Sequence, residues 1–247
     1  MTASLIFALL GCLIWFVLEL AEQEKEEEIN VVAEIEKIAR AYDPSPHYVW
    51  EKMAAQSLTS VRLGKVYNIY QSAMHATRAE VYKLPYLDTV PLRKIKLDIL
   101  NDDDNLPNGG AHHYQLADLF RWLGAVGMIP DDDFGSLGWK AATMETPTGT
   151  FINIVEALYN KSLGPWCIIE RLSKSWLFGL HRGLGCPSHP YFNGITAVED
   201  RHANIAIDTT CLVLETRPLL ADIFLYDAEM VARALTGVWD DMLAAVR

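Results

Sequence analysis

Apolar residues recur along most of the chain at the three- and four-residue spacing that places them on one face of a helix. No segment shows a sustained alternation of apolar and polar residues, so we expect no β-sheet. This pattern, with its proline and glycine breaks, predicts helices over residues 24–40, 47–82, 91–104, 111–124, 151–161, 166–180, 191–203 and 217–246. The sequence therefore predicts an all-α fold, a bundle of about seven to eight helices.

The N-terminal segment has a different character from the rest of the chain. Residues 3–18 are uncharged and mostly apolar, and an acidic stretch follows them. No basic residue precedes this run and no A-x-A cleavage motif follows it, so it does not resemble a secretory signal. Its length falls slightly below the roughly 17–25 residues of a membrane span. Three interpretations stay open: a membrane anchor, an apolar helix packed on the domain or on a partner, and an extension outside the functional fold.

Composition supports a single folded domain over residues 23–247, with residues 1–22 treated separately. Hydrophobic residues make up 51% of the chain, enough for a sizeable core. The formal charge of −11 and the absence of a basic stripe argue against a nucleic-acid partner. The four cysteines are far apart and show no C-x-x-C spacing, which indicates reduced thiols. We therefore expect a cytoplasmic protein, with membrane contact through residues 3–18 left open.

The helix over 191–203 carries Glu199 and His202 three residues apart, so both side chains leave the same face. A carboxylate and an imidazole in this arrangement can share one transition-metal ion. The alternative is a surface pair, with Glu199 in a salt bridge to a neighbouring residue. The metal hypothesis gains weight because other helices offer matching ligands.

An acidic cluster ends the helix over 91–104. Asp103 falls near the centre of its apolar face, Asp102 lies at the margin, and Asp104 points away. A carboxylate on an apolar face needs a partner or a metal. The alternative is that these acids mark a fraying helix end before the following turn.

Two more helices carry candidate ligands. His112 lies near the centre of its helix's apolar stripe and His113 toward the edge, so His112 is the preferred ligand, although both could be polar caps. Glu170 is an acid among apolar neighbours, and its alternative partner is Lys174 four residues later.

The inward-facing polar residues form one constellation, with Asp102 and His113 as alternates: Asp103, His112, Glu170, Glu199 and His202. Several carboxylates with two imidazoles inside a helical bundle are the ligands that hold oxygen-activating iron pairs. No phosphate-binding loop or G-x-S-x-G motif competes with this assignment.

Four segments together resemble the heme-oxygenase-like diiron oxidases, which are related by fold to thiaminase II and pyrroloquinoline-quinone synthase. The resemblance covers roughly residues 47–245. LPYLDTVPLRKIKLDILNDDD looks like the family's second core helix, which ends in an acidic ligand, and HHYQLADLFRWLG looks like its histidine-led helix. GPWCIIERLSKSWLFGL looks like the segment that supplies a single glutamate. YFNGITAVEDRH is similar to the last ligand helix, YF-x-x-H-x-x-x-D-x-x-H.

The resemblance implies a heme-oxygenase-like bundle and a nonheme diiron oxygenase that binds two Fe(2+) ions per chain and uses O₂. Glu170 and Glu199 would be its catalytic carboxylates. The implied substrate is a small amine or amino acid. The variant ligands bring the sequence nearest to the cyanobacterial nitrile synthase type, which converts a tryptophan-like amino acid to a nitrile in secondary metabolism. A homodimer is compatible with this interpretation.

Three positions depart from the family pattern. Glu199 stands where the family usually has Asp, and Asp103 where it has Glu. Ile195 stands where the family has a histidine, and isoleucine cannot coordinate a metal. We therefore expect one iron to bind weakly until an amino-acid substrate fills the open position.

Two rival functions remain. One is a metal-free helical bundle that binds a ligand or a partner. The other is a hydrolase of the thiaminase-II type, in which Cys167 would serve as the nucleophile. The apolar neighbours of Cys167 disfavour the thiolate that this chemistry requires.

Overall fold

The computed structural model describes residues 30–87, 89–104, 111–125, 127, 129 and 145–247. Within these ranges the side chains of residues 79–80, 90–91, 103–104 and 194–197 lie outside the description. Residues Val32–Arg247 form one compact unit, which contains the helices that form the candidate site.

The described residues form nine α-helices and one 3-10 helix, and they contain no strand. In chain order these are α2 (Val31–Ala41), α3 (Tyr48–Ala54), α4 (Ser60–Val81), α5 (Val90–Asp104), α6 (His112–Trp122), α8 (Pro147–Leu158), α9 (Gly164–Gly183), α10 (Pro190–Thr216), η1 (Pro218–Leu220) and α11 (Ala221–Val246). The predicted all-α class is confirmed for this part of the chain.

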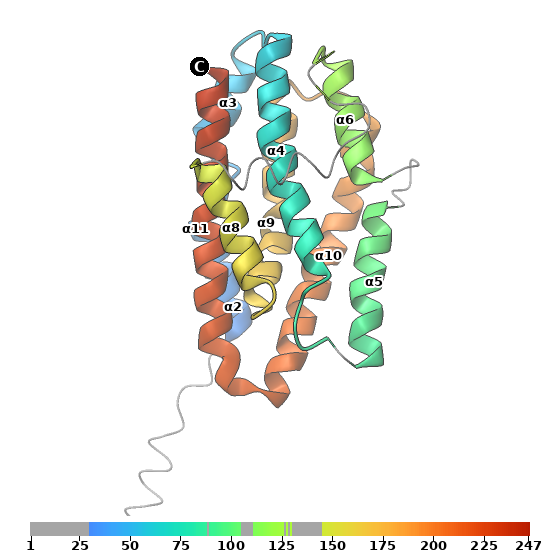
Figure 1. Ribbon diagram of the computed structural model, residues 1–247, viewed down its shortest axis with the longest axis vertical. Coiled ribbons are helices and arrows are strands. Elements are labelled where there is room, and N and C mark those ends of the chain that lie inside the picture. Colours follow the sequence, from blue (N-terminus) through green and yellow to red (C-terminus); the bar gives the residue numbers. More distant parts are fainter. Residues whose placement is uncertain (1–29, 88, 105–110, 126, 128, 130–144) are drawn as a thin grey trace, which may run out of the picture. The chain divides into compact units, whose positions relative to one another are not determined.

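The bundle is built around α9 and α11. Helix α11 packs on α8, α9, α4 and α3, while α10 packs on α9 and also contacts α5 and α6 (Figure 1). Apolar residues at helical spacing along α9 are buried, among them Trp166, Leu172, Trp176 and Leu180. The three-residue and four-residue spacing of these side chains gives α9 its apolar faces toward its neighbours.

The predicted helix over 47–82 is two helices in the structure. Residues 55–59 separate α3 from α4, and Gly64 lies inside α4. The hydroxyl oxygen of Thr59 accepts a hydrogen bond from the backbone N–H of Arg62 at 3.3 Å, the contact that an N-terminal cap makes. The Ser and Thr residues before α4 therefore mark its start.

The two C-terminal helices differ from their predicted limits. Helix α10 continues to Thr216, well past the predicted end at residue 203. The last predicted helix begins instead with η1, after which α11 follows. Although both are apolar, Leu219 and Ile223 are 90% and 51% exposed, whereas Phe224 is fully buried. The 3-10 turn changes the helix register here, so the face expected from a continuous α-helix is not the buried one.

None of the described helices has a stretch long and apolar enough to cross a membrane. The apolar segment 3–18 and the loop predicted around Asp131–Asp133 lie outside the described residues.

Candidate metal centre

Helices α9 and α10 lie side by side and bring three potential metal ligands together. Glu170 comes from the middle of α9, and Glu199 and His202 come from α10. Because Glu199 and His202 are three residues apart in one helix, both face inward, and they are only 7% and 1% exposed. The alternative of a surface pair is therefore wrong for these two residues.

One ligand atom from each of the three residues lies within 4.8 Å of the other two. The ring nitrogen Nδ1 of His202 lies 3.7 Å from Oε2 of Glu170. Atoms that each bond to one ion must lie close together, and this spacing is compatible with one ion between the three donors. Among the described residues, Glu170, Glu199 and His202 form a group that could hold a metal ion.

Neighbouring side chains hold two of these ligands in position. The indole N–H of Trp166 donates a hydrogen bond of 2.9 Å to Oε1 of Glu170, the oxygen that does not face His202. The other ring nitrogen of His202, Nε2, lies 3.3 Å from Oδ2 of Asp102, which also forms an ion pair with Arg201. Glu170 and His202 therefore each direct one atom toward the ligand group and another toward a neighbouring side chain that holds it in position.

The donor set fits a hard or borderline divalent cation. Two carboxylates and one neutral imidazole suit Fe(2+), Mn(2+) or Zn(2+), and no thiolate is present among them to favour a soft metal. Burying two carboxylates beside each other is costly unless a cation or protons compensate their charge. The residues present therefore fit a bound metal ion.

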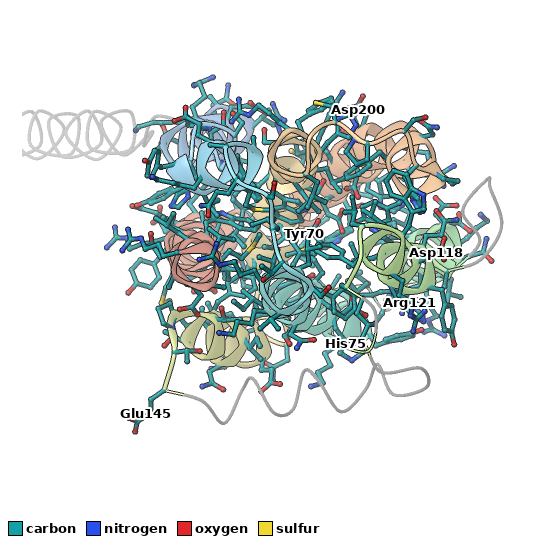
Figure 2. All side chains as sticks on the ribbon, turned by 90° about the horizontal axis from the view of Figure 1, so that it is seen from above. Tyr70, His75, Asp118, Arg121, Glu145 and Asp200 are labelled. Atoms are coloured by element: carbon teal, nitrogen blue, oxygen red, sulfur yellow. The ribbon has the colours of Figure 1, made fainter. Side chains whose placement is uncertain are left out.

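Lys174, the alternative partner expected for Glu170, binds elsewhere. Its ammonium group contacts both carboxylate oxygens of Asp200, at 2.7 and 2.6 Å, on the exposed side of α10 (Figure 2). Glu170 instead faces the interior, where Trp166 and His202 are its neighbours. The Lys174 alternative therefore does not account for the position of Glu170.

Three of the remaining predicted ligands, Asp102, His112 and His113, lie near the group but are not part of it. Asp102 is placed at the far nitrogen of His202. Nε2 of His112 lies 3.2 Å from the hydroxyl of Tyr191, and the ring of His113 lies against Tyr114 at 4.2 Å between centroids. The side chains of two further predicted positions, Asp103 and Ile195, lie outside the described residues.

A cavity of about 80 Å³ opens directly beside the ligand group. Helices α4, α6, α9 and α10 contribute its walls. Four aromatic side chains line it: Tyr70, Tyr159, Trp176 and Tyr191. The cavity is therefore partly aromatic and adjoins the three potential ligands.

Helix α4 supplies a polar part of the same wall. Gln71, His75 and Arg78 line the cavity from positions about one helical turn apart. Burial lowers the pKa of His75, and the positive charge of Arg78 lowers it further. The i, i+4, i+7 spacing from Gln71 to Arg78 indicates that the three side chains share one face of the helix, so this polar face is predictable from the sequence.

Tyr70, Tyr191 and His112 form a series of polar contacts along the cavity wall. The hydroxyls of Tyr70 and Tyr191 are 3.5 Å apart, and that of Tyr191 reaches His112. Burial raises the pKa of Tyr70, and the negative charge of Glu199 raises it further, while hydrogen bonds from Tyr191 and Trp176 oppose the shift. Tyr70, which lies among the helices in Figure 2, is therefore a neutral phenol at ordinary pH.

Cys167, the nucleophile that the hydrolase hypothesis requires, is only 1% exposed. Burial raises the pKa of its thiol to about 12. At neutral pH the thiol is protonated and shielded from solvent, which is the opposite of a reactive cysteine's environment.

Comparison of the chain with protein-family models, with curated proteins and with solved structures gives no match. The conclusions about the site therefore depend on its own geometry.

Proposed function

We propose that this protein is a nonheme iron oxygenase that uses O₂ to oxidise a small amine or amino acid. The observation that carries the proposal is the convergence of Glu170, Glu199 and His202 within 4.8 Å beside a cavity. A buried group of this composition next to a cavity is a typical candidate for a catalytic metal centre.

The ligand residues would hold a ferrous ion, which supplies the ability to activate O₂. Glu170 and Glu199 provide negative charge that favours the bound cation, and His202 provides a neutral nitrogen donor. Trp166 and Asp102 fix the orientation of Glu170 and His202, so little rearrangement is needed on binding.

The cavity walls would position the substrate and restrict water. Tyr70, Tyr159 and Trp176 offer aromatic surfaces for an apolar or aromatic side chain. Arg78 offers a guanidinium group that suits a carboxylate. These features support an aromatic amino acid as substrate, and the resemblance to nitrile synthases extends this to conversion of a tryptophan-like amino acid to a nitrile.

A second iron belongs to the same proposal. The acidic residue that would serve it is Asp103, and the position where relatives have a histidine is Ile195. A site without that imidazole would bind its iron weakly, and an amino-acid substrate could fill the open position with its amine or carboxylate. Substrate and second iron would then tighten each other's binding by the same factor.

The proposal is tested by loading purified protein anaerobically with Fe(2+) and measuring bound iron. Glu170→Ala and His202→Ala should each lose most of the tightly bound iron. Asp200→Ala is the matched control, because Asp200 is an acid adjacent to Glu199 that points to solvent and pairs with Lys174. Wild-type iron content in both ligand variants would show that the proposed centre is wrong.

The same measurement separates the oxygenase from a metal-free binding protein. A folded wild-type chain that binds no iron, manganese or zinc would favour the binding protein. O₂ consumption that requires both iron and an added aromatic amino acid would support the oxygenase and its substrate class together.

A further inference from the structure

A series of aromatic rings extends from the candidate metal cavity toward a second recess on the bundle. Trp176 and Tyr70 line the cavity. The ring centroid of Trp239 on α11 lies 6.1 Å from that of Trp176 and 6.4 Å from that of Tyr70. Trp239 also contacts Trp50, at 5.3 Å. These spacings are those of aromatic rings in direct contact.

The outer end of the series is a surface recess. Trp239 lines this recess together with Tyr42 and Asp240, although Trp239 itself is only 1% exposed. The hydroxyl of Tyr42 donates a hydrogen bond of 3.1 Å to Oε1 of Glu229. Trp239 therefore contacts two aromatic residues of the metal cavity's wall and also lines the recess.

Tryptophan and tyrosine are the aromatic side chains that lose an electron most readily, and rings in contact exchange single electrons efficiently. A tryptophan can become a radical cation without losing a proton at once. A tyrosine must give up its phenolic proton, so it needs an acceptor within hydrogen-bond reach. Glu229 is such an acceptor for Tyr42.

Charged side chains surround the hydroxyl of Tyr42 at the recess. Arg233, which lines the recess with Asp240, donates a hydrogen bond of 3.2 Å to this hydroxyl and one of 3.0 Å to Oε1 of Glu229. The guanidinium group therefore holds the carboxylate of Glu229 beside the phenol, where the carboxylate can take up the phenolic proton.

We propose that Trp176, Trp239 and Tyr42 form a relay that carries single electrons from the surface recess to the metal cavity. The relay rests on the proposed function, because an oxidising metal ion in the cavity is what would draw the electrons. It gives the centre a route to a small one-electron reductant, such as ascorbate, that does not pass through the substrate cavity.

Each step of the relay moves one electron. An oxidising metal ion held in the cavity would take one electron from Trp176. Trp176 would regain an electron from Trp239, and Trp239 would regain one from Tyr42, which lines the same recess. The phenolic proton of Tyr42 passes to the carboxylate of Glu229 as its electron leaves. The reductant then returns one electron to Tyr42, and Glu229 returns the proton. The net change is one electron gained by the metal and one lost by the reductant.

The relay can be tested without metal, because it is a property of the rings alone. Metal-free protein is illuminated with a bulky ruthenium polypyridyl photo-oxidant and persulfate, and oxidised residues are located by peptide mass spectrometry. Trp176 is only 4% exposed, so the photo-oxidant reaches it poorly by direct contact. We expect oxidation of Trp176 in the wild type and a several-fold decrease in Trp239→Phe.

The matched control is Trp122→Phe, which removes a tryptophan that is 61% exposed and lies outside the relay. This control should leave the oxidation of Trp176 unchanged. If circular dichroism shows that Trp239→Phe does not fold, Tyr42→Phe takes its place, since it removes only a hydroxyl near the surface. Two results would overturn the relay. One is that Trp176 is not detectably oxidised in the wild type, and the other is that it is oxidised equally in the wild type and in the folded Trp239→Phe or Tyr42→Phe variant.

An iron-loaded arm separates the relay from the proposed function. When substrate-free, iron-loaded protein is exposed to O₂ without reductant, we expect oxidation at Tyr42, shifting to Trp239 in Tyr42→Phe. Dependence of Trp176 oxidation on Trp239 in a chain that binds no iron would support the relay and contradict the oxygenase. A chain that binds iron, but in which Trp176 is oxidised equally with and without Trp239, would support the oxygenase and contradict the relay.

Discussion

Asp102 lies 3.3 Å from Nε2 of His202, on the other side of the imidazole from Glu170, which faces Nδ1 at 3.7 Å. If Nδ1 binds a metal ion, Nε2 carries the proton and donates it to this carboxylate. A carboxylate in this position would fix the tautomer of the histidine and make it a better ligand. We therefore propose that Asp102 orients His202 and is not itself a ligand.

Asp102→Ala should weaken iron binding by about 10–100-fold, the usual effect of removing a residue that orients a ligand. Competition with a chelator of known affinity measures this change. Asp98→Ala is the control, because Asp98 lies on the same helix and pairs with exposed Lys94. Complete loss of iron would instead identify Asp102 as a direct ligand. Unchanged affinity for iron would show that Asp102 does not support the metal site and only forms its ion pair with Arg201.

Cys167 should resist alkylation in the folded protein. Burial raises the pKa of its thiol to about 12, so the reactive thiolate is scarce at any pH below that value. Iodoacetamide at pH about 8 should modify the exposed Cys186 and leave Cys167 intact, as read by peptide mass spectrometry. Rapid modification of Cys167 in the folded protein, with loss of a hydrolytic activity, would contradict this prediction and support the hydrolase hypothesis.

Asp227 should make the fold less stable as pH rises. Burial raises the pKa of this carboxyl above its usual value, although a hydrogen bond from Ser162 and the charge of Lys161 oppose the shift. The folded state therefore holds the proton more tightly than the unfolded state. The resulting stabilisation is fully present below the unfolded pKa and is lost as pH rises through the folded pKa.

Urea unfolding measured at several values between about pH 4 and pH 7 tests this dependence. The free energy of unfolding of Asp227→Asn should fall less over this interval than that of the wild type. Asp222→Asn is the control, because Asp222 is an exposed acid on the same helix. Parallel pH profiles for the wild type and Asp227→Asn would contradict the prediction.

Gly179→Ala should destabilise the bundle. A Cβ at this position would lie 2.4 Å from the ring of Trp50. The ring cannot shift freely, because its N–H donates to the carbonyl of Pro44 at 2.6 Å and its other side contacts Trp239. Overpacking of this kind costs about 1–3 kcal/mol, which thermal or chemical unfolding would detect. Phe178→Ala, at a neighbouring side chain that is 51% exposed, should change stability much less.

The helices could be predicted from sequence where their signals are local. The apolar stripe of α9 and the same-face placement of Glu199 and His202 follow from helical spacing alone, and the structure confirms that both side chains are buried. The break before α4 was not predicted, because its local signal is the single hydroxyl cap at Thr59. The extension of α10 past residue 203 depends on packing against α9, which has no local signature.

Contacts between distant helices could not be predicted in the same way. The pairing of His112 with Tyr191 joins residues 79 positions apart, and that of His202 with Asp102 joins residues 100 positions apart. Which nitrogen of a histidine faces which neighbour depends on the positions of whole helices. The same holds for Trp239, whose place between two cavities is set by the packing of α11 on α9 and α4.

All three residues of the ligand group come from one helical hairpin, α9 and α10, whereas much of the cavity wall comes from α4 and α6. An ion bound by the hairpin would close only a short loop of the chain, so ordering the ligands costs little chain entropy. Substitutions on α4 and α6 can change the shape and polarity of the cavity without touching a metal ligand. If the proposed function holds, substrate preference and metal binding can diverge independently in evolution, because each is encoded in a different stretch of the gene.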